Sequence, residues 1–428
     1  MYNINNNKNT AFFLTLISPF IGLFFTLSHW RESWAKNAFW LACTFLGAVL
    51  IYWPEGTVLG EGSDGGRYVL RLMEMYGSSL SLSGIMSMYM VDQNTMDLYF
   101  PIVAYGISRF TDNGHVLFTV FAFVFGYFYS RNIWYVLERC QGIKKGLIVV
   151  LIGLFFLVNP ITNINGVRYN TAIHIFIYAL LPYLWEHDKS KLWWLIAVPL
   201  THFSFMYVVV LVIVYLLIPK NIKTKGNILL VIAMVLFIVS LFINSVNLSS
   251  VSHVLEEYSP ESYEERIDAY VDQDYLDENL ERRSQINWYI GASGIIKNWC
   301  YSLLLIFLYP CIKRQQGSKG QLYVFYTFTL FFGAFANFMS LIPSGGRFLI
   351  VSQMLIISLI LLMFSTISPQ DTYRRMLDFS MFLLIIPLIT DIRRLFDYYS
   401  ITAVFGNFVT VFFWENNVSL IDWIKQII

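Results

Sequence analysis

Three arginines each follow a Gly or an Asn near the start of an apolar run, and this repeated arrangement suggests chemistry. The stretches are SDGGRY with Arg67, INGVRYN with Arg168 and IPSGGRFL with Arg347. A helix N-terminus carries about half a positive charge, so a cation placed there is repelled. A bound anion reverses that sign, because guanidinium and backbone N–H groups both donate to it. The pattern predicts a shared anion site. The alternative for each arginine is snorkelling or pairing with a nearby acid.

Small polar residues precede these arginines and are candidate helix N-caps, which satisfy the first backbone N–H groups of a helix. Arg71 lies four residues after Arg67 on the same helical face, and Glu74 is placed three residues further on to pair with it. The candidate caps are Ser63 or Asp64, Asn163 or Asn165, and Ser344.

Two titratable side chains are candidate proton acceptors. His202 lies in an apolar run, and a neutral imidazole there can take a proton from a hydroxyl. Asp64 is the second candidate. A satisfied interior histidine is the alternative for His202. Other side chains are expected in the same cavity: Tyr68, Asn165, Tyr169, Asn170, His174, Thr201, Ser204 and Ser344.

Composition points to a membrane protein. Of 428 residues, 57% are hydrophobic and 13% are charged, against about 25% charged in soluble domains. Apolar runs of about 20 residues recur, and each is long enough to cross a bilayer. The net charge of +1 gives no reason to expect a nucleic-acid partner. No zinc-type spacing, P-loop or dinucleotide-binding motif occurs, so we expect neither metal nor cofactor.

Basic residues predict the orientation, because cytoplasmic loops are enriched in Lys and Arg. We place the segments between the basic connectors outside, together with the N-terminus. The basic connectors are 29–37, 131–145, 186–191, 219–226, 313–320 and 368–375. The outside segments are 54–114, 160–170, 248–287 and 342–348.

The stretch 192–218 conflicts with this alternation, because it separates two basic connectors that are both predicted inside. It is too short for two full crossings. We expect a re-entrant pair of half-helices that meet near Thr201 and His202, with Pro199 supplying the break. Such a turn is tolerated where protein or a water-filled cavity shelters it. A plain tilted crossing is the alternative.

The chain is expected to be one transmembrane domain over 1–428, all α-helical, with about eleven or twelve crossings plus the re-entrant pair. Two outer-face loop regions are large, 54–114 and 248–287. The first is expected to hold an interfacial helix at 80–91 and a short apolar run at 97–110.

The region 248–287 is acidic and rich in tyrosine. A solvated cap is the simpler interpretation, and a lid over a sugar-containing substrate is the functional one, because aromatic faces stack on sugars. Near the end of the chain, 401–417 is a candidate final crossing and 418–428 an interfacial helix.

An ordered set of motifs resembles the EpsG-like family of bacterial polysaccharide loci, related in role to O-antigen polymerases of the Wzy type. The motifs are EGSDGGRY, NGVRYNTA, THFSF and GGRF. The resemblance covers roughly residues 11 to 365 and leaves 366–428 unmatched. The first motif departs from the usual form, because Gly65 follows the Asp where a Tyr is common.

This resemblance implies a metal-independent membrane glycosyltransferase of the C type. It would polymerise undecaprenyl-diphosphate-linked repeat units at the outer face of the inner membrane. Arg67, Arg71, Arg168 and Arg347 would bind the diphosphate leaving group, and His202 or Asp64 would take the acceptor proton. A chain-length regulator, a flippase and membrane lipids are the implied partners.

Three other functions stay open at this point. A flippase or exporter of the same lipid-linked units would favour internal repeats, which the sequence lacks. A membrane acyltransferase would not need three outer arginines. A ligase that moves glycan to a lipid core shares the polymerase chemistry.

Overall fold

Helices make up the regular structure of the chain wherever it is described. The computed structural model describes residues 2–50, 64–79, 81–91, 97–140, 145–218, 227–243, 288–315, 320–342, 344–368, 370–413 and 418–428. Within these ranges the β-structure is one isolated antiparallel bridge, between Ser400 and Ser419. The outer region 248–287, with its proposed cap or lid, lies outside the described residues. The prediction of an all-α polytopic membrane protein is confirmed.

Five helical stretches in these ranges are long and apolar enough to cross a membrane. Five shorter apolar helices of 10–17 residues accompany them. The predicted total of eleven or twelve crossings stays a prediction, because helix length and composition do not show whether the shorter helices cross the membrane. The five stretches are Gly114–Arg139, Val149–Glu186, Gly291–Lys313, Gly320–Met339 and Gly345–Thr366.

The N-terminal helices pack closely through small residues. They are α1 (Tyr2–Ile17), α2 (Pro19–Ser28) and α3 (Ala35–Val49), and α3 lies along α7 (Gly114–Arg139). A Cβ atom on Gly47 would lie 2.2 Å from the Cβ of Ala122, and one on Gly126 would lie 2.7 Å from the Cβ of Cys43. Small residues at such contacts let helix backbones approach one another in a membrane.

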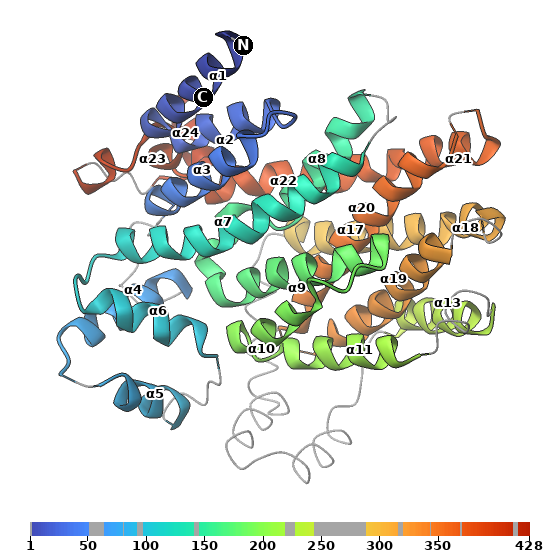
Figure 1. Cartoon of the computed structure of the whole chain (residues 1–428), viewed down its shortest axis with the longest axis horizontal. Helices are drawn as coiled ribbons and strands as arrows, with labels where there is room; N and C mark the ends of the chain where they lie inside the picture. Colours follow the sequence, from blue (N-terminus) through green and yellow to red (C-terminus); the bar gives the residue numbers. More distant parts are fainter. Residues whose placement is uncertain are drawn as a thin grey trace.

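The segment after α3 forms three helices beside the main bundle, at the left of Figure 1: α4 (Asp64–Tyr76), α5 (Leu82–Val91) and α6 (Tyr99–Ser108). They confirm the helix predicted at 80–91 and show that the run 97–110 is helical as well. The Arg109 guanidinium donates to the backbone carbonyl oxygens of Met75, at 2.5 Å, and Ser78, at 3.4 Å. This contact ties the end of α6 to the end of α4.

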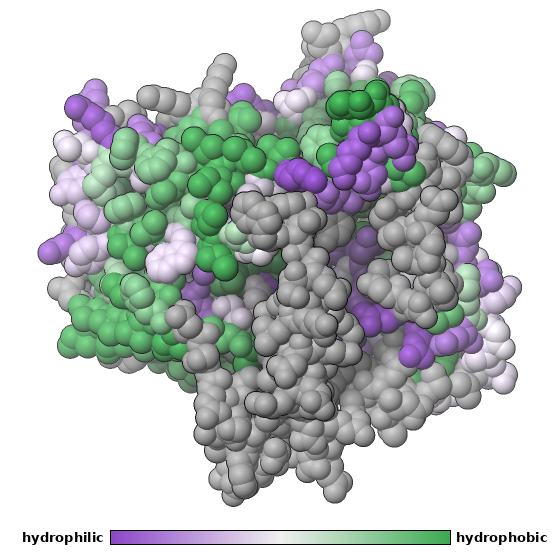
Figure 2. Space-filling model, turned by 180° about the vertical axis from the view of Figure 1, so that it is seen from behind, coloured by the Kyte–Doolittle hydropathy of each residue, from purple (hydrophilic) through white to green (hydrophobic). Residues whose placement is uncertain are grey.

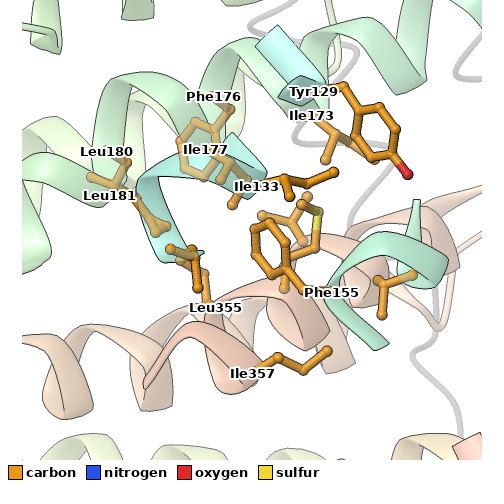
Figure 3. Packing of buried hydrophobic residues seen from close by; sticks show 14 of the residues in the cluster. Tyr129, Ile133, Phe155, Ile173, Phe176, Ile177, Leu180, Leu181, Leu355 and Ile357 are labelled. Carbon is orange, nitrogen blue, oxygen red and sulfur yellow. The ribbon is translucent and has the colours of Figure 1, made fainter. Parts of the chain in front are cut away.

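Four helices meet in the apolar centre of the bundle. They are α7, α8 (Lys145–Val158), α9 (Val167–Glu186) and α20 (Phe348–Thr366), and the short 3-10 helix η1 (Ile161–Gly166) joins α8 to α9. Figure 3 shows Tyr129 and Ile133 of α7, Phe155 of α8, and Leu355 of α20 turned toward the α9 side chains Ile173 to Leu181. The Tyr129 hydroxyl donates to the Phe156 carbonyl at 2.9 Å, which satisfies its polar tip.

The chain between Glu186 and residue 218 leaves one end of the bundle and returns to it. It forms η2 (Leu192–Ile196), α10 (Ala197–Thr201) and α11 (Phe205–Leu217). Glu186 lies beside Arg139 at the C-terminal end of α7, and we call this the Glu186 end. The turn at His202 lies at the other end, beside the first turn of α9, and we call this the Arg168 end.

The later part of α11 runs back toward the Glu186 end. The Tyr215 hydroxyl donates to the Val324 carbonyl at 2.8 Å, near the start of α19 (Gly320–Met339). This path matches the expected re-entrant pair. The break falls at His202 itself, whose backbone is extended with φ −151°. Pro199 does not supply it, because Pro199 lies in the first turn of α10, where its missing N–H removes no helical hydrogen bond.

Two helices expose continuous apolar faces, as expected where a helix faces lipid. On α13 (Asn227–Phe242) and α11 the exposed apolar side chains recur every three or four residues. Figure 2 shows a broad apolar area on the described part of the surface, with hydrophilic side chains at its left margin. The exposed apolar residues of α11 and α13 are Met206, Tyr207, Val210, Ile213, Val214, Leu217, Ile228, Val231, Ile232, Val235, Leu236, Ile238, Val239 and Phe242.

The last part of the bundle begins with α17 (Trp288–Phe307) and α18 (Tyr309–Gln315), followed by α19, η4 (Gly345–Arg347) and α20. The chain then forms α21 (Thr372–Ser380), η5 (Met381–Leu384), α22 (Ile385–Tyr398), α23 (Ile401–Phe405), η6 (Thr410–Phe412) and α24 (Leu420–Ile427).

The candidate crossing at 401–417 is wrong. Over the described residues 401–413 the structure gives two short helices. The first, α23, ends at Phe405, and the Asn407 side chain accepts from the N–H groups of Val409 and Thr410, both at 2.9 Å, at the start of η6. The helix predicted at 418–428 is confirmed as α24.

A buried ion pair joins α17 to α22. Lys297 Nζ lies 2.5 Å from Asp391 Oδ1, and the two side chains are 13% and 4% exposed. The other oxygen of Asp391 and the hydroxyl of Tyr301 are buried without a hydrogen-bond partner among the described residues. Removing one partner of such a pair leaves an uncompensated charge in an apolar interior.

We expect Lys297→Met to destabilise the protein by about 3–5 kcal/mol, because Asp391 then loses its counter-charge. The double variant Lys297→Met with Asp391→Leu should recover most of that loss, since neither charge stays buried. Lys313→Met, at an exposed lysine, is the matched control. Thermal unfolding of the purified variants in detergent measures all three. A double variant that is as unstable as the single one would contradict the ion-pair explanation.

Cysteine labelling tests the re-entrant path. Single cysteines at Lys189 and Ile218 should react with a membrane-impermeant maleimide from the same side of the membrane. A cysteine at Ser204 should react from the other side. The four native cysteines are all buried, so they should give little background. Labelling of positions 189 and 218 from opposite sides would show that the stretch is an ordinary crossing.

Candidate functional site

Arg168 stands in the first turn of α9 and has two polar partners. Its Nη1 atom lies 2.9 Å from Asp97 Oδ2, and its Nε atom donates to the hydroxyl of Tyr68 at 3.2 Å. Tyr68 belongs to α4, so this arginine joins the outer helices to the bundle. Its charge is paired with a carboxylate of 7% exposure.

Asp97 is the site residue that sequence reasoning missed. It precedes α6, and its second oxygen accepts from the backbone N–H of Phe203 at 2.6 Å. The next residue donates as well, from Leu98 N to the Leu200 carbonyl at 2.9 Å. The one signal in the sequence was an acid at the first position of the apolar run 97–110, and nothing there indicated its partners.

His202 lies at the turn between α10 and α11 and is half-buried. Its ring meets the Tyr169 ring edge-on, with centroids 5.1 Å apart and planes at 89°. Its Nδ1 atom lies 2.8 Å from Ser204 Oγ, and which of the two donates depends on the tautomer. Thr201 instead donates to the Ala197 carbonyl within α10, so its hydroxyl is used locally.

Arg347 contacts the same tyrosine. It ends η4, and its guanidinium carbon lies 5.4 Å from the centroid of the Tyr169 ring. Tyr169 is 5% exposed, and its hydroxyl is buried without a hydrogen-bond partner in the part of the chain that the structure describes. A buried unpaired hydroxyl costs free energy, so a ligand atom that reaches it gains a hydrogen bond.

Arg67 and Arg71 make ion pairs within α4. Arg67 is 64% exposed and pairs with Asp64, and Arg71 lies 3.2 Å from Glu74, as predicted. The buried face of α4 carries Gly65, Gly66, Tyr68, Val69, Leu72 and Met75 instead. The structure therefore brings Arg347 and His202 to Tyr169, next to Arg168. Arg67 and Arg71 pair within α4, and Asp64 lies near the start of α9, with its Oδ2 atom 3.9 Å from the position of a Cβ on Gly166. Shared binding of one anion by the arginines stays a prediction.

The expected asparagine caps do not form. The N-cap of α9 is Gly166, without a side-chain hydrogen bond. Asn170 instead donates from its amide to the carbonyls of Asn163, at 2.9 Å, and Gly166, at 3.0 Å, and so holds η1 against α9. Asn165 packs against Gly65, where an added Cβ would lie 3.2 Å from its Oδ1 atom.

His174 has a structural environment. It is fully buried, its Nε2 lies 3.0 Å from the Asn159 carbonyl, and Asn132 approaches its Nδ1 at 3.4 Å. A carbonyl can only accept, so Nε2 carries a proton. His174 therefore links α7, α8 and α9 below the cluster.

Ser344 does not cap the helix that follows it. Its φ is +61°, it makes no side-chain cap hydrogen bond, and η4 separates it from α20. The reason is the packing of Gly345. A Cβ there would lie 1.7 Å from the Met339 carbonyl oxygen, so the chain must turn tightly against the end of α19. This turn sets the position of Arg347.

Chemically, the cluster offers a cation, an unpaired hydroxyl and an imidazole around one buried aromatic ring. Such a set can bind an anionic oxygen and accept a proton nearby. Among the described residues, no group of three or more His, Cys, Asp or Glu side chains is placed to hold a metal ion.

An all-helical, multi-pass membrane protein with this polar cluster at one end of its bundle is the class that the fold and the site define. The chain belongs to the EpsG family, whose model matches residues 60–413. That match reaches beyond residue 365, where the motif resemblance stopped. No curated protein and no solved structure matches significantly. Membership is consistent with a polymerase-like role in polysaccharide synthesis at a membrane.

The two glycines before Arg347 should respond differently to substitution. Gly345→Ala places a methyl group against the Met339 carbonyl, so we expect a destabilisation of about 1–3 kcal/mol and a displaced Arg347. Gly346→Ala meets no atom within 4 Å and is the matched control. Thermal unfolding of the two variants measures the difference. Equal unfolding temperatures would refute the role given to Gly345.

Proposed function

We propose that this chain is a polymerase of oligosaccharide repeat units carried on undecaprenyl diphosphate. It acts at the outer face of the bacterial inner membrane, and its product is an O-antigen, capsule or exopolysaccharide. Membership of the EpsG family supports this role. Basic residues are concentrated in the connectors at the Glu186 end, and cytoplasmic loops are enriched in Lys and Arg. This supports a Glu186 end that faces the cytoplasm and an Arg168 end that faces outward.

The observation that carries the proposal is the environment of Tyr169. Its hydroxyl is buried without a hydrogen-bond partner in the described residues, and its ring contacts both an exposed arginine and a half-buried histidine. A lipid-linked sugar diphosphate supplies the matching groups, an anion for Arg347 and an oxygen for the hydroxyl. Arg347 binds such an anion better than Lys does, because its planar fork donates two parallel hydrogen bonds.

The reaction transfers the growing glycan to the next lipid-linked unit. The acceptor hydroxyl oxygen bonds to the anomeric carbon of the donor, and the bond from that carbon to the diphosphate oxygen breaks. The hydroxyl proton moves to His202, and the lipid diphosphate leaves with its electron pair. Arg347 stabilises the charge that develops on the diphosphate. His202 therefore acts at the acceptor hydroxyl, and Arg347 acts at the leaving diphosphate.

The contact between His202 and Ser204 links the tautomer of the imidazole to the direction of one hydrogen bond. If Nδ1–H donates to Ser204 Oγ, then Nε2 is the nitrogen that accepts the proton. Ser204 then fixes the orientation of the base. Asp64 is a weaker candidate for this step, because Arg67 already binds its carboxylate.

The remaining arginines have supporting roles in this proposal. Arg168 keeps Tyr68 and the start of α9 in place, while Arg67 and Arg71 line the approach along α4. A flippase supplies the lipid-linked units, a chain-length regulator acts on the product, and lipids surround the exposed apolar faces.

His202→Gln tests the proposal, because glutamine keeps a polar side chain but cannot act as the base. We expect polymer formation to fall by about 10²–10⁴-fold at normal protein level, while single repeats accumulate on the lipid carrier. His29→Gln is the matched control, at a histidine that contacts Phe25 and Trp34 away from the cluster. Glycan length on gels and protein level on blots are measured together.

The outcomes separate the alternatives. Normal polymer at normal protein level would end the general-base role of His202. Cells that lack this chain should make single-repeat product. Unligated long chains in such cells would indicate a ligase, and repeat units trapped inside would indicate a flippase.

A further inference from the structure

The pair Asp97–Leu98 joins three parts of the chain that are distant in sequence. Asp97 Oδ2 binds Arg168 at 2.9 Å, and Asp97 Oδ1 accepts from Phe203 N at 2.6 Å. Leu98 N donates to the Leu200 carbonyl at 2.9 Å. Two adjacent residues therefore hold both sides of the His202 turn and the first turn of α9.

The turn needs such partners for a physical reason. His202 is extended, so the helical hydrogen-bond ladder stops there and the Phe203 N–H has to be satisfied from outside the helix. A carboxylate is a strong acceptor for a backbone N–H. The same carboxylate fixes the plane of the Arg168 guanidinium, whose Nε atom is then directed at Tyr68.

We propose that Asp97 is a positioning residue that locks the His202 turn and Arg168 into one fixed arrangement. Asp97 does not itself take the acceptor proton, because both of its oxygens already accept hydrogen bonds. Its effect on polymer formation rests on the proposed function. Its effect on the His202 turn does not, since it can be measured on the protein alone.

Chemical modification of His202 reads out this arrangement. The purified full-length protein is treated with diethyl pyrocarbonate, and the rate at His202 is followed by peptide mass spectrometry. Exposed His187 is the internal reference for reagent and buried His174 is the protected one. No glycan substrate is needed.

Asp97→Asn keeps the size of the side chain but removes the charge that holds Arg168. We expect modification of His202 to become at least about threefold faster relative to His187, and polymer in cells to fall at least about tenfold. Asp112→Asn, at an exposed aspartate after the same helix, is the matched control and should change neither. Asp97→Glu, which keeps the charge, should restore part of both.

Each result decides the proposal. Faster His202 modification in Asp97→Asn supports it, even if no polymerase activity exists. An unchanged rate overturns it, whatever happens to the polymer. If Asp97→Asn does not accumulate, Asp97→Glu is compared with wild type in its place.

A faster modification of His202 in Asp97→Glu than in wild type supports positioning, because one added methylene moves the turn. An unchanged modification rate overturns the proposal. Lost polymer with an unchanged His202 rate would instead indicate that Asp97 contacts the substrate.

Discussion

An interrupted helix in an apolar environment must find hydrogen-bond partners for the backbone groups that the interruption releases. That requirement governs the Arg168 end of this protein. The turn at His202 keeps three backbone bonds of its own: His202 N donates to Val198 O and Phe205 N to His202 O, both at 3.0 Å, and Met206 N donates to Phe203 O at 2.8 Å. The Phe203 N–H is satisfied by Asp97. Because Asp97 also binds Arg168, the order of this end depends on one buried carboxylate.

The features that could be predicted from the sequence are local ones. The apolar runs predicted an all-helical membrane protein. Two successive basic connectors, both predicted on the inside, required the stretch between them to return to the same side, which predicted a re-entrant pair with its turn near His202. The Arg71–Glu74 pair followed from helical spacing. Each of these depends on residues within one segment, or on the simple alternation of segments across a membrane.

The capping predictions at the starts of α9 and α20 failed because side chains near these helix starts have other partners. Asn170 binds carbonyls of η1 from within α9, so no asparagine before the helix is needed to organise its start. At Ser344 the tight contact between Gly345 and the end of α19 decides the backbone path. Asp97 escaped prediction because its two partners lie 71 and 106 residues later in the chain. Nothing in residue type or spacing indicates contacts over such separations.

The ion pair between Lys297 and Asp391 has a consequence for how the protein is made. Helix α22 holds Asp391, Arg393, Arg394 and Asp397 within 14 residues, and each charge disfavours transfer of an isolated helix into lipid by about 2.5–3.5 kcal/mol. Its counter-charge on α17 is synthesised 94 residues earlier. Docking of α22 against α17 supplies the counter-charge for Asp391, so the stable placement of α22 depends on α17. Because α17 comes first in the chain, the partner of Asp391 is already made when α22 is synthesised.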